Sequence, residues 1–143
     1  MSRLQENALD LDALLAETAD PASGALVVFA GTVRNENDAR AVAGIAYSAH
    51  AALAERTLAR IEAETRERFQ IRECRILHRL GKLVPGEISV LVVVRAAHRE
   101  AAFAAARYAI DTLKASVPVW KEERYEDGQS QFLEGVTLQA PKL

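Results

Sequence analysis

The chain has 143 residues, half of them hydrophobic, and carries a formal net charge of −2 at pH 7. This length predicts a single domain over residues 1–143 with a sizeable core, and the interspersed charges argue against nucleic acid as the main partner. No apolar run reaches the length of a membrane span, and no signal-peptide core is present at the N-terminus. A lone cysteine, Cys74, fits a reducing cytosol. We therefore expect a cytoplasmic protein with no membrane association, no metal site and no cofactor.

The first helix is predicted over residues 11–19, with Asp10 as its N-cap. Residues 24–33 read G-A-L-V-V-F-A-G-T-V and are apolar on both parities, which predicts a strand buried on both faces. Arg34 follows at the end of this strand, where it can hold an anion. Its simpler interpretation is a solvated loop charge, because acidic residues lie nearby.

A short strand over residues 43–48 is predicted to precede a second helix of about five turns. The charged faces of that helix, Glu62 included, are most simply solvated. In the following strand, alternation places Cys74 and His78 on one face. Cys74 is interpreted as a small core residue, and His78 as a satisfied, half-buried histidine.

Residues 84–87, V-P-G-E, predict a turn with proline and glycine in its central positions, and residues 88–94 predict another strand buried on both faces. A third helix is expected to begin at His98 and Arg99 and to end before Pro118. Spacings of three and four residues predict its buried face, which comprises Phe103, Ala106, Ile110, Leu113 and Val117.

Two lysines flank the corner at which this third helix gives way to a strand. Lys114 lies near the end of the helix, and Lys121 follows in the strand, where it shares a face with Glu123. Each has a simple alternative: Lys114 can pair with Asp111 on an exposed face, and Lys121 can be balanced by Glu123.

Cations at the start of the third helix predict an anion site. His98 and Arg99 occupy a helix N-terminus, where free N–H groups and a guanidinium suit a phosphate or carboxylate. A solvated Arg99 is the simpler interpretation. We expect Arg34, His98 and Arg99 to gather around an anion that Lys114 and Lys121 act on. Clustered cations would also lower the pKa of a lysine and make it usable as a base or nucleophile.

The chain then continues as a hairpin with its turn at Asp127-Gly128. Strands mixed with three helices, without a regular alternation of the two, predict an α+β domain.

Five short segments occur in a fixed order between residues 24 and 123. They are F-A-G-T-V-R-N-E-N (29–37), H-R-L-G (78–81), P-G-E (85–87), A-H-R (97–99) and L-K-A-S-V-P-V-W-K-E-E (113–123). Together they resemble the large, catalytic subunit of molybdopterin synthase, and five linked segments are far more specific than any one of them.

The resemblance implies a fold, an activity and partners. The fold would be an α/β-hammerhead-type domain with a mixed or antiparallel sheet and about three helices. Two copies would form a central homodimer, and each would bind a small ubiquitin-like sulfur-carrier subunit with a C-terminal Gly-Gly thiocarboxylate, giving a heterotetramer. This sulfurtransferase would add two sulfurs to cyclic pyranopterin monophosphate (precursor Z) and open its cyclic phosphate. The product is the molybdopterin dithiolene of molybdenum cofactor biosynthesis.

The resemblance also implies site residues. Lys114 and Lys121 match the catalytic pair of the family. The matching substrate-binding positions are Thr32, Val33, Arg34, His98, Arg99, Glu122 and Glu123.

Two other classes of function remain open from the residues. One is a non-catalytic domain that binds a small phosphorylated ligand with the same arginines, and it predicts phosphate binding without turnover. The other is a pure assembly subunit, in which Arg34 and Arg99 are surface charges.

Overall fold

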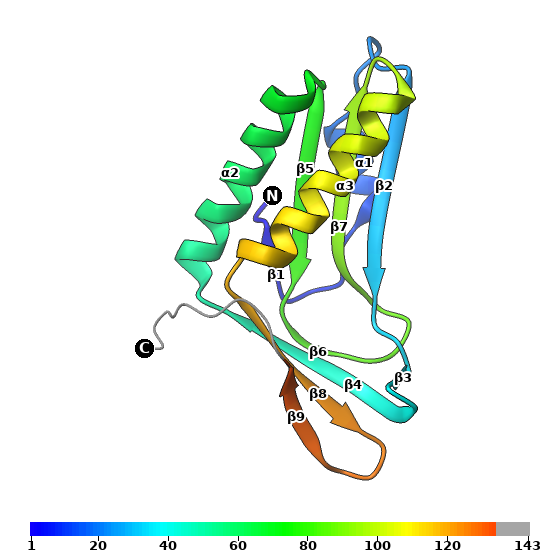
Figure 1. The fold of residues 1–143 in the computed structure, drawn as a ribbon, viewed down its shortest axis with the longest axis vertical. Coiled ribbons are helices and arrows are strands. Elements are labelled where there is room, and N and C mark those ends of the chain that lie inside the picture. Colours follow the sequence, from blue (N-terminus) through cyan, green and yellow to red (C-terminus); the bar gives the residue numbers. More distant parts are fainter. Residues whose placement is uncertain (134–143) are drawn as a thin grey trace.

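The computed structural model describes residues 1–133, so the predicted domain end at residue 143 lies outside them. The elements are β1 (Leu4–Gln5), α1 (Leu11–Glu17), β2 (Ala25–Thr32), β3 (Glu36–Asn37), β4 (Arg40–Ala49), α2 (Ala51–Phe69), β5 (Glu73–Arg79), β6 (Gly81–Leu83), β7 (Ile88–Ala96), α3 (Arg99–Ser116), β8 (Val119–Tyr125) and β9 (Ser130–Leu133) (Figure 1). Helices segregated from largely antiparallel sheets confirm the predicted α+β class.

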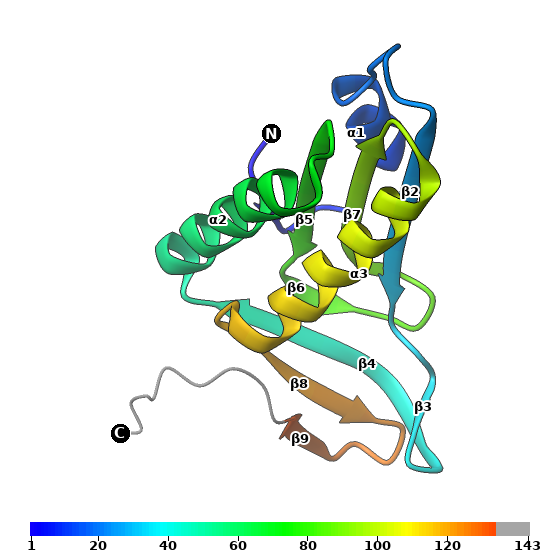
Figure 2. The same ribbon diagram turned by 45° about the horizontal axis from the view of Figure 1, so that its top comes forward.

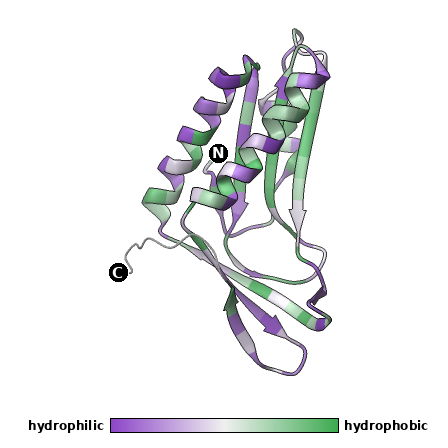
Figure 3. Cartoon of the chain, in the orientation of Figure 1, coloured by the Kyte–Doolittle hydropathy of each residue, from purple (hydrophilic) through white to green (hydrophobic). Residues whose placement is uncertain are grey.

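The first sheet has the strand order β1-β5-β7-β2, with β1 parallel to β5 and the other pairs antiparallel. Helices α2 and α3 cover one face and α1 lies on the other (Figure 2). Because side chains alternate along a strand, Val92 and Val94 pack with α2 and α3, whereas Leu91 and Val93 pack with Leu14 of α1. The prediction that this strand is buried on both faces is confirmed, and Figure 3 shows the visible part of β7, behind α3, mostly in the green of hydrophobic residues.

The second sheet has the order β3-β4-β8-β9. β6 also pairs with β4, on the edge opposite β8. The chain enters it three times, first where β3 and β4 follow β2 of the first sheet. β6 directly follows β5, and β8 follows α3 after Pro118 turns the chain out of the helix. The two sheets therefore meet near the C-terminal end of α3 (Figure 2).

Local signals located most elements well. Asp10 caps α1 by accepting from the N–H of Ala13, although the helix ends at Glu17 rather than at the predicted residue 19. The predicted turns contain Gly86 and Gly128 at positive φ of 94° and 89°. Within residues 1–133, no helix combines the length and apolar character that a membrane span requires.

The prediction that residues 24–33 are buried on both faces is wrong. Among residues 1–133, β2 pairs only with β7 and forms the edge of the first sheet. Leu26 and Phe29 keep 45% and 36% of their surface exposed, because within one chain the helices cover β2 only in part.

Two residues are predicted on the wrong side of a helix, Glu62 in α2 and Phe103 in α3, whereas Ala106, Leu113 and Val117 are buried as predicted. Glu62 is 2% exposed rather than solvated: its carboxylate accepts from the Arg3 guanidinium at 2.9 Å and from the N–H of Ile76 at 2.9 Å, which ties α2 to the edge of β5. Phe103 is 63% exposed. The buried face of α3 consists mainly of small residues, which are Ala102, Ala105, Ala106, Ala109 and Leu113.

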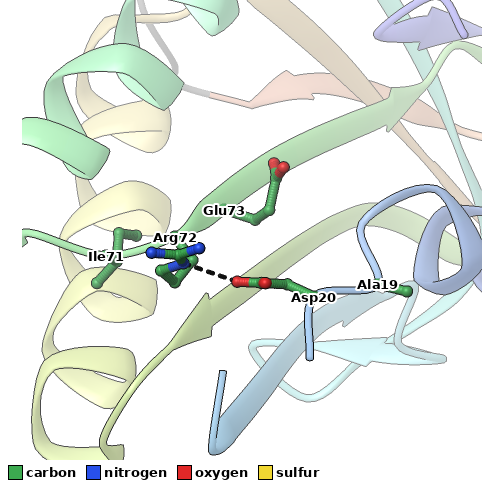
Figure 4. A pocket seen from close by; sticks show the side chains of 5 residues that line it. All are labelled: Ala19, Asp20, Ile71, Arg72 and Glu73. Atoms are coloured by element: carbon green, nitrogen blue, oxygen red, sulfur yellow. Dashed lines mark hydrogen bonds and ion pairs between the residues drawn. The ribbon is translucent and has the colours of Figure 1, made fainter. Parts of the chain in front are cut away.

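A polar depression at the surface, shown in Figure 4, has a structural explanation. It is lined by Ala19, Asp20, Ile71, Arg72 and Glu73. The Arg72 guanidinium donates to Asp20 at 2.8 Å and, with backbone and hydroxyl donors, lowers the pKa of Asp20 to about 2. This ion pair joins the turn before β2 to the start of β5.

Candidate active site

A cavity of about 280 Å³ lies where the two sheets and the end of α3 meet. Its lining comes from elements far apart in the sequence. The lining residues are Gly31, Thr32, Arg34, Asn37, Ile45, Tyr47, Ser89, Lys114, Lys121, Glu123 and Leu133. Three of these side chains are cationic and one is acidic, so the cavity suits an anion.

The two lysines reach this cavity from the two sides of the corner at Pro118. Lys114 lies in the last turn of α3, where the helix dipole favours a cation. Lys121 lies on β8 opposite Tyr47 of β4. Because strand residues two apart share a face, Glu123 lines the same cavity as Lys121.

Burial and neighbouring charge change the acid–base chemistry of this corner. The pKa of Lys121 is lowered, first by burial and then by Lys114, while Glu123 opposes the shift. His78 is buried nearby, with its ring 5.2 Å from that of Tyr47 in an edge contact. Burial lowers the pKa of His78 to about 4, so this histidine is neutral at pH 7. It is buried rather than half-buried as predicted.

The structure gathers five of the nine predicted site residues at this cavity, namely Thr32, Arg34, Lys114, Lys121 and Glu123. Two others from the same segments lie beside it. Val33 is buried behind the cavity with Ile45 and Leu83. Glu122 lies on the other face of β8, where it accepts from Ser130 at 2.8 Å.

The expectation that His98 and Arg99 gather with Arg34 is wrong within one chain. They begin α3, whereas Lys114 lies in its last turn. At about 1.5 Å per residue, Arg99 and Lys114 are separated by about 22 Å along the helix axis. His98 and Arg99 are also exposed.

Three polar lining residues escaped the sequence analysis: Asn37, Tyr47 and Ser89. Tyr47 and Ser89 lie within strands that were predicted as apolar or unremarkable, and only the meeting of the two sheets brings them together. A serine inside the apolar run I-S-V-L-V-V-V was the one local signal.

These features define a small α+β protein with a cavity lined by two lysines and an arginine, a charge pattern that suits an anion. A family model described as "MoaE protein" matches residues 4–116. The chain therefore belongs to the MoaE protein family, and the resemblance seen in the five segments is confirmed.

Individual relatives agree with this assignment. The chain is 43% identical to a molybdopterin synthase catalytic subunit of a Nostoc species over 87% of this chain and 76% of the relative. It is 43% identical to the subunit of the same name from Oryza sativa subsp. indica, over 85% of this chain but only 63% of the relative. Among solved structures, molybdopterin synthase from Staphylococcus aureus superposes with a TM-score of 0.87 at 33% identity, covering 92% of this chain and 96% of that one.

Proposed function

We propose that this chain is the catalytic subunit of a molybdopterin synthase, a sulfurtransferase that converts precursor Z into molybdopterin. The observation that carries the proposal is the convergence of Lys114, Lys121 and Arg34 on one cavity. Membership of the MoaE family supports it, because relatives that match most of the chain are named molybdopterin synthase catalytic subunit.

The cavity offers a chemical role for each cation. Arg34 and Lys114 supply fixed positive charge that stabilises a phosphate group and the charge that develops as the cyclic phosphate opens. Lys121 has a lowered pKa, so a larger share of it is present as the free amine than for an ordinary lysine. Lys114 and Lys121 thus form the proposed catalytic pair, with Glu123 as their counter-charge.

Sulfur must come from outside this chain. Cys74 is the only cysteine, and it is fully buried among apolar side chains of the first sheet and α2. Burial raises its pKa to about 12, so the thiol stays protonated and is a poor nucleophile. We therefore propose delivery by a small partner subunit with a thiocarboxylated C-terminus: its sulfur passes to the substrate, and water returns the carboxylate. A free Cys74 also suits the proposed cytoplasmic location.

Cys74→Ser should keep turnover within about twofold of wild type when the partner supplies sulfur, because the thiol does not reach the cavity. Burying a hydroxyl in this core should lower stability by roughly 1–3 kcal/mol, so Cys74→Ala serves as a control without that hydroxyl. Thermal unfolding and a turnover assay measure the two effects separately. A folded variant that binds the partner but forms no product would instead make Cys74 a sulfur carrier.

A second copy of this chain is the proposed homodimer partner. The edge strand β2 and the outer side of α3 border a largely apolar groove of about 470 Å³. Phe29 and Phe103 expose their rings there. Arg107 and Asp111 line it too and form an exposed ion pair with each other at 3.5 Å. In a dimer with a two-fold axis, each would meet its counterpart of opposite charge from the second copy.

The position of this groove along α3 would account for His98 and Arg99, which lie far from the cavity of their own chain. Ala106 and Arg107 are the middle residues between Arg99 and Lys114, and both line the groove. Two α3 helices crossing there in antiparallel fashion, at the usual ~8–10 Å, would bring His98 and Arg99 of each copy beside Lys114 of the other. Each cavity would then gain the two substrate-binding residues that it lacks within one chain.

The reaction itself is the test of the proposed function. The chain is mixed with precursor Z and a thiocarboxylated small subunit, and molybdopterin formation is followed. We expect molybdopterin only in the complete mixture, and not when the carrier ends in an ordinary carboxylate. Binding of precursor Z without product in the complete mixture would favour a non-catalytic phosphate-binding domain instead.

A further inference from the structure

Glu123 is a buried carboxylate held by neutral donors. It is 4% exposed, yet it has no cation within 4 Å among residues 1–133. Its Oε1 accepts from the Tyr125 hydroxyl at 2.7 Å and from the Asn37 amide at 3.0 Å. Buried carboxylates are usually paired with a cation, so this arrangement beside Lys121 calls for an explanation.

The two donors are themselves fixed by the fold. Tyr125 ends β8, and its ring lies under the Arg40 guanidinium, 3.5 Å from the ring centroid. Arg40 in turn donates to Asp127 and Gln129 in the next turn, at 3.2 and 2.9 Å. Asn37 comes from the β3–β4 hairpin, whose turn residues take positive φ of 51° and 64°.

We propose that Tyr125 and Asn37 are positioning residues that hold Glu123 away from a direct ion pair with Lys121. Both neutral donors bond the same carboxylate oxygen of Glu123, Oε1. Its other oxygen, Oε2, has no hydrogen-bond partner among the described residues. Glu123 then balances the cavity's positive charge, while the Lys121 amine stays free for the substrate. The inference rests on the proposed function for its catalytic meaning, but the positioning can be measured in the free chain.

Other groups around this pair also set its charge balance. Those facing Lys121 or Glu123 are Arg34, Lys114, Tyr47, His78 and Tyr125. His78 is neutral at pH 7 and the pKa values of Tyr47 and Tyr125 are raised, so these three stay uncharged between pH 7 and 9. The charge balance of the pair therefore depends on Arg34, Lys114 and Lys121 itself.

Tyr125→Phe tests the proposal, because it removes the hydroxyl and keeps the ring under Arg40. The freed carboxylate can turn toward Lys121 and pair with it, which favours the protonated amine. We expect the pKa of Lys121 to rise by about one unit, as measured by NMR titration of isotope-labelled lysines, with Lys121→Arg assigning the signal. In the complete mixture, kcat at neutral pH should fall roughly tenfold, while the KM for precursor Z changes by less than about twofold.

Tyr108→Phe is the matched control, because the Tyr108 ring on α3 packs against Phe69 of α2 and does not line the cavity. It should leave the Lys121 titration unchanged. Asn37→Ala removes the second donor and should shift that titration in the same direction, so it carries the test if Tyr125→Phe does not fold. An unchanged Lys121 titration in the folded variants would overturn the positioning role. Absence of product with wild-type protein would refute the proposed function and leave the titration result standing.

Discussion

Lys114→Ala and Lys121→Ala are each expected to reduce turnover by roughly a hundredfold or more, the usual cost of losing a positioned acid, base or nucleophile. Both side chains line the cavity, and neither belongs to the buried core of the fold. Melting temperatures should therefore stay close to that of wild type. Steady-state assays with precursor Z and a thiocarboxylated partner measure the loss.

An arginine variant separates the positive charge of Lys121 from its ability to give up a proton. Lys121→Arg keeps the positive charge but cannot give up a proton near neutral pH, so we expect it to be nearly as inactive as Lys121→Ala. Lys82→Ala removes an exposed lysine from β6 that does not line the cavity, and it should retain full activity. Rates within a few-fold of wild type for both alanine variants would refute the assignment of the catalytic pair.

Activity should also depend on pH in a direction set by Lys121. Its pKa is lowered by burial and by Lys114, and a base or nucleophile acts as the free amine. The rate should therefore rise with pH and level off below the usual lysine pKa of about 10.5.

The residues nearest the corner were the most predictable part of the site. The arrangement of Lys114, Lys121 and Glu123 follows from one helix end, one proline and the two-residue period of a strand. All three signals are local, so a single sequence suffices to place them. Tyr47 and Ser89 join them only because two sheets meet, and no local pattern encodes that meeting.

The errors share a cause, which is that an apolar or charged pattern does not say which neighbour covers it. β2 looks like a central strand because its residues are apolar, but it forms the edge of the first sheet. Glu62 looks solvated because its helix is rich in charge. In the fold, however, it is buried because its carboxylate accepts hydrogen bonds from Arg3 near the N-terminus and from the N–H of Ile76 in β5. In the proposed dimer, the exposed Phe29 and Phe103 would also be covered, by a second copy of the chain.

A mixed dimer is expected to regain activity that both of its parent proteins lack. Arg99→Ala removes a charge-assisted bond worth about 1.5–3 kcal/mol, which corresponds to roughly a 10- to 150-fold loss, and Lys114→Ala should be nearly inactive. If Arg99 serves the cavity of the other copy, a dimer of one Arg99→Ala chain and one Lys114→Ala chain contains one intact cavity and one doubly damaged cavity. Differently tagged chains, co-expressed and purified for both tags, should therefore show about half the wild-type turnover per dimer.

The matched control places both substitutions in one chain and pairs that chain with wild type. With Arg99 acting across the dimer, each cavity of this control lacks either Lys114 or Arg99, so its turnover should stay at or below that of Arg99→Ala. With Arg99 acting within its own chain, the pattern reverses: the control keeps one intact cavity and the first mixed dimer keeps none. The separation of about 22 Å between Arg99 and Lys114 along α3 favours the first pattern, and half activity in the control dimer alone would exclude the shared site.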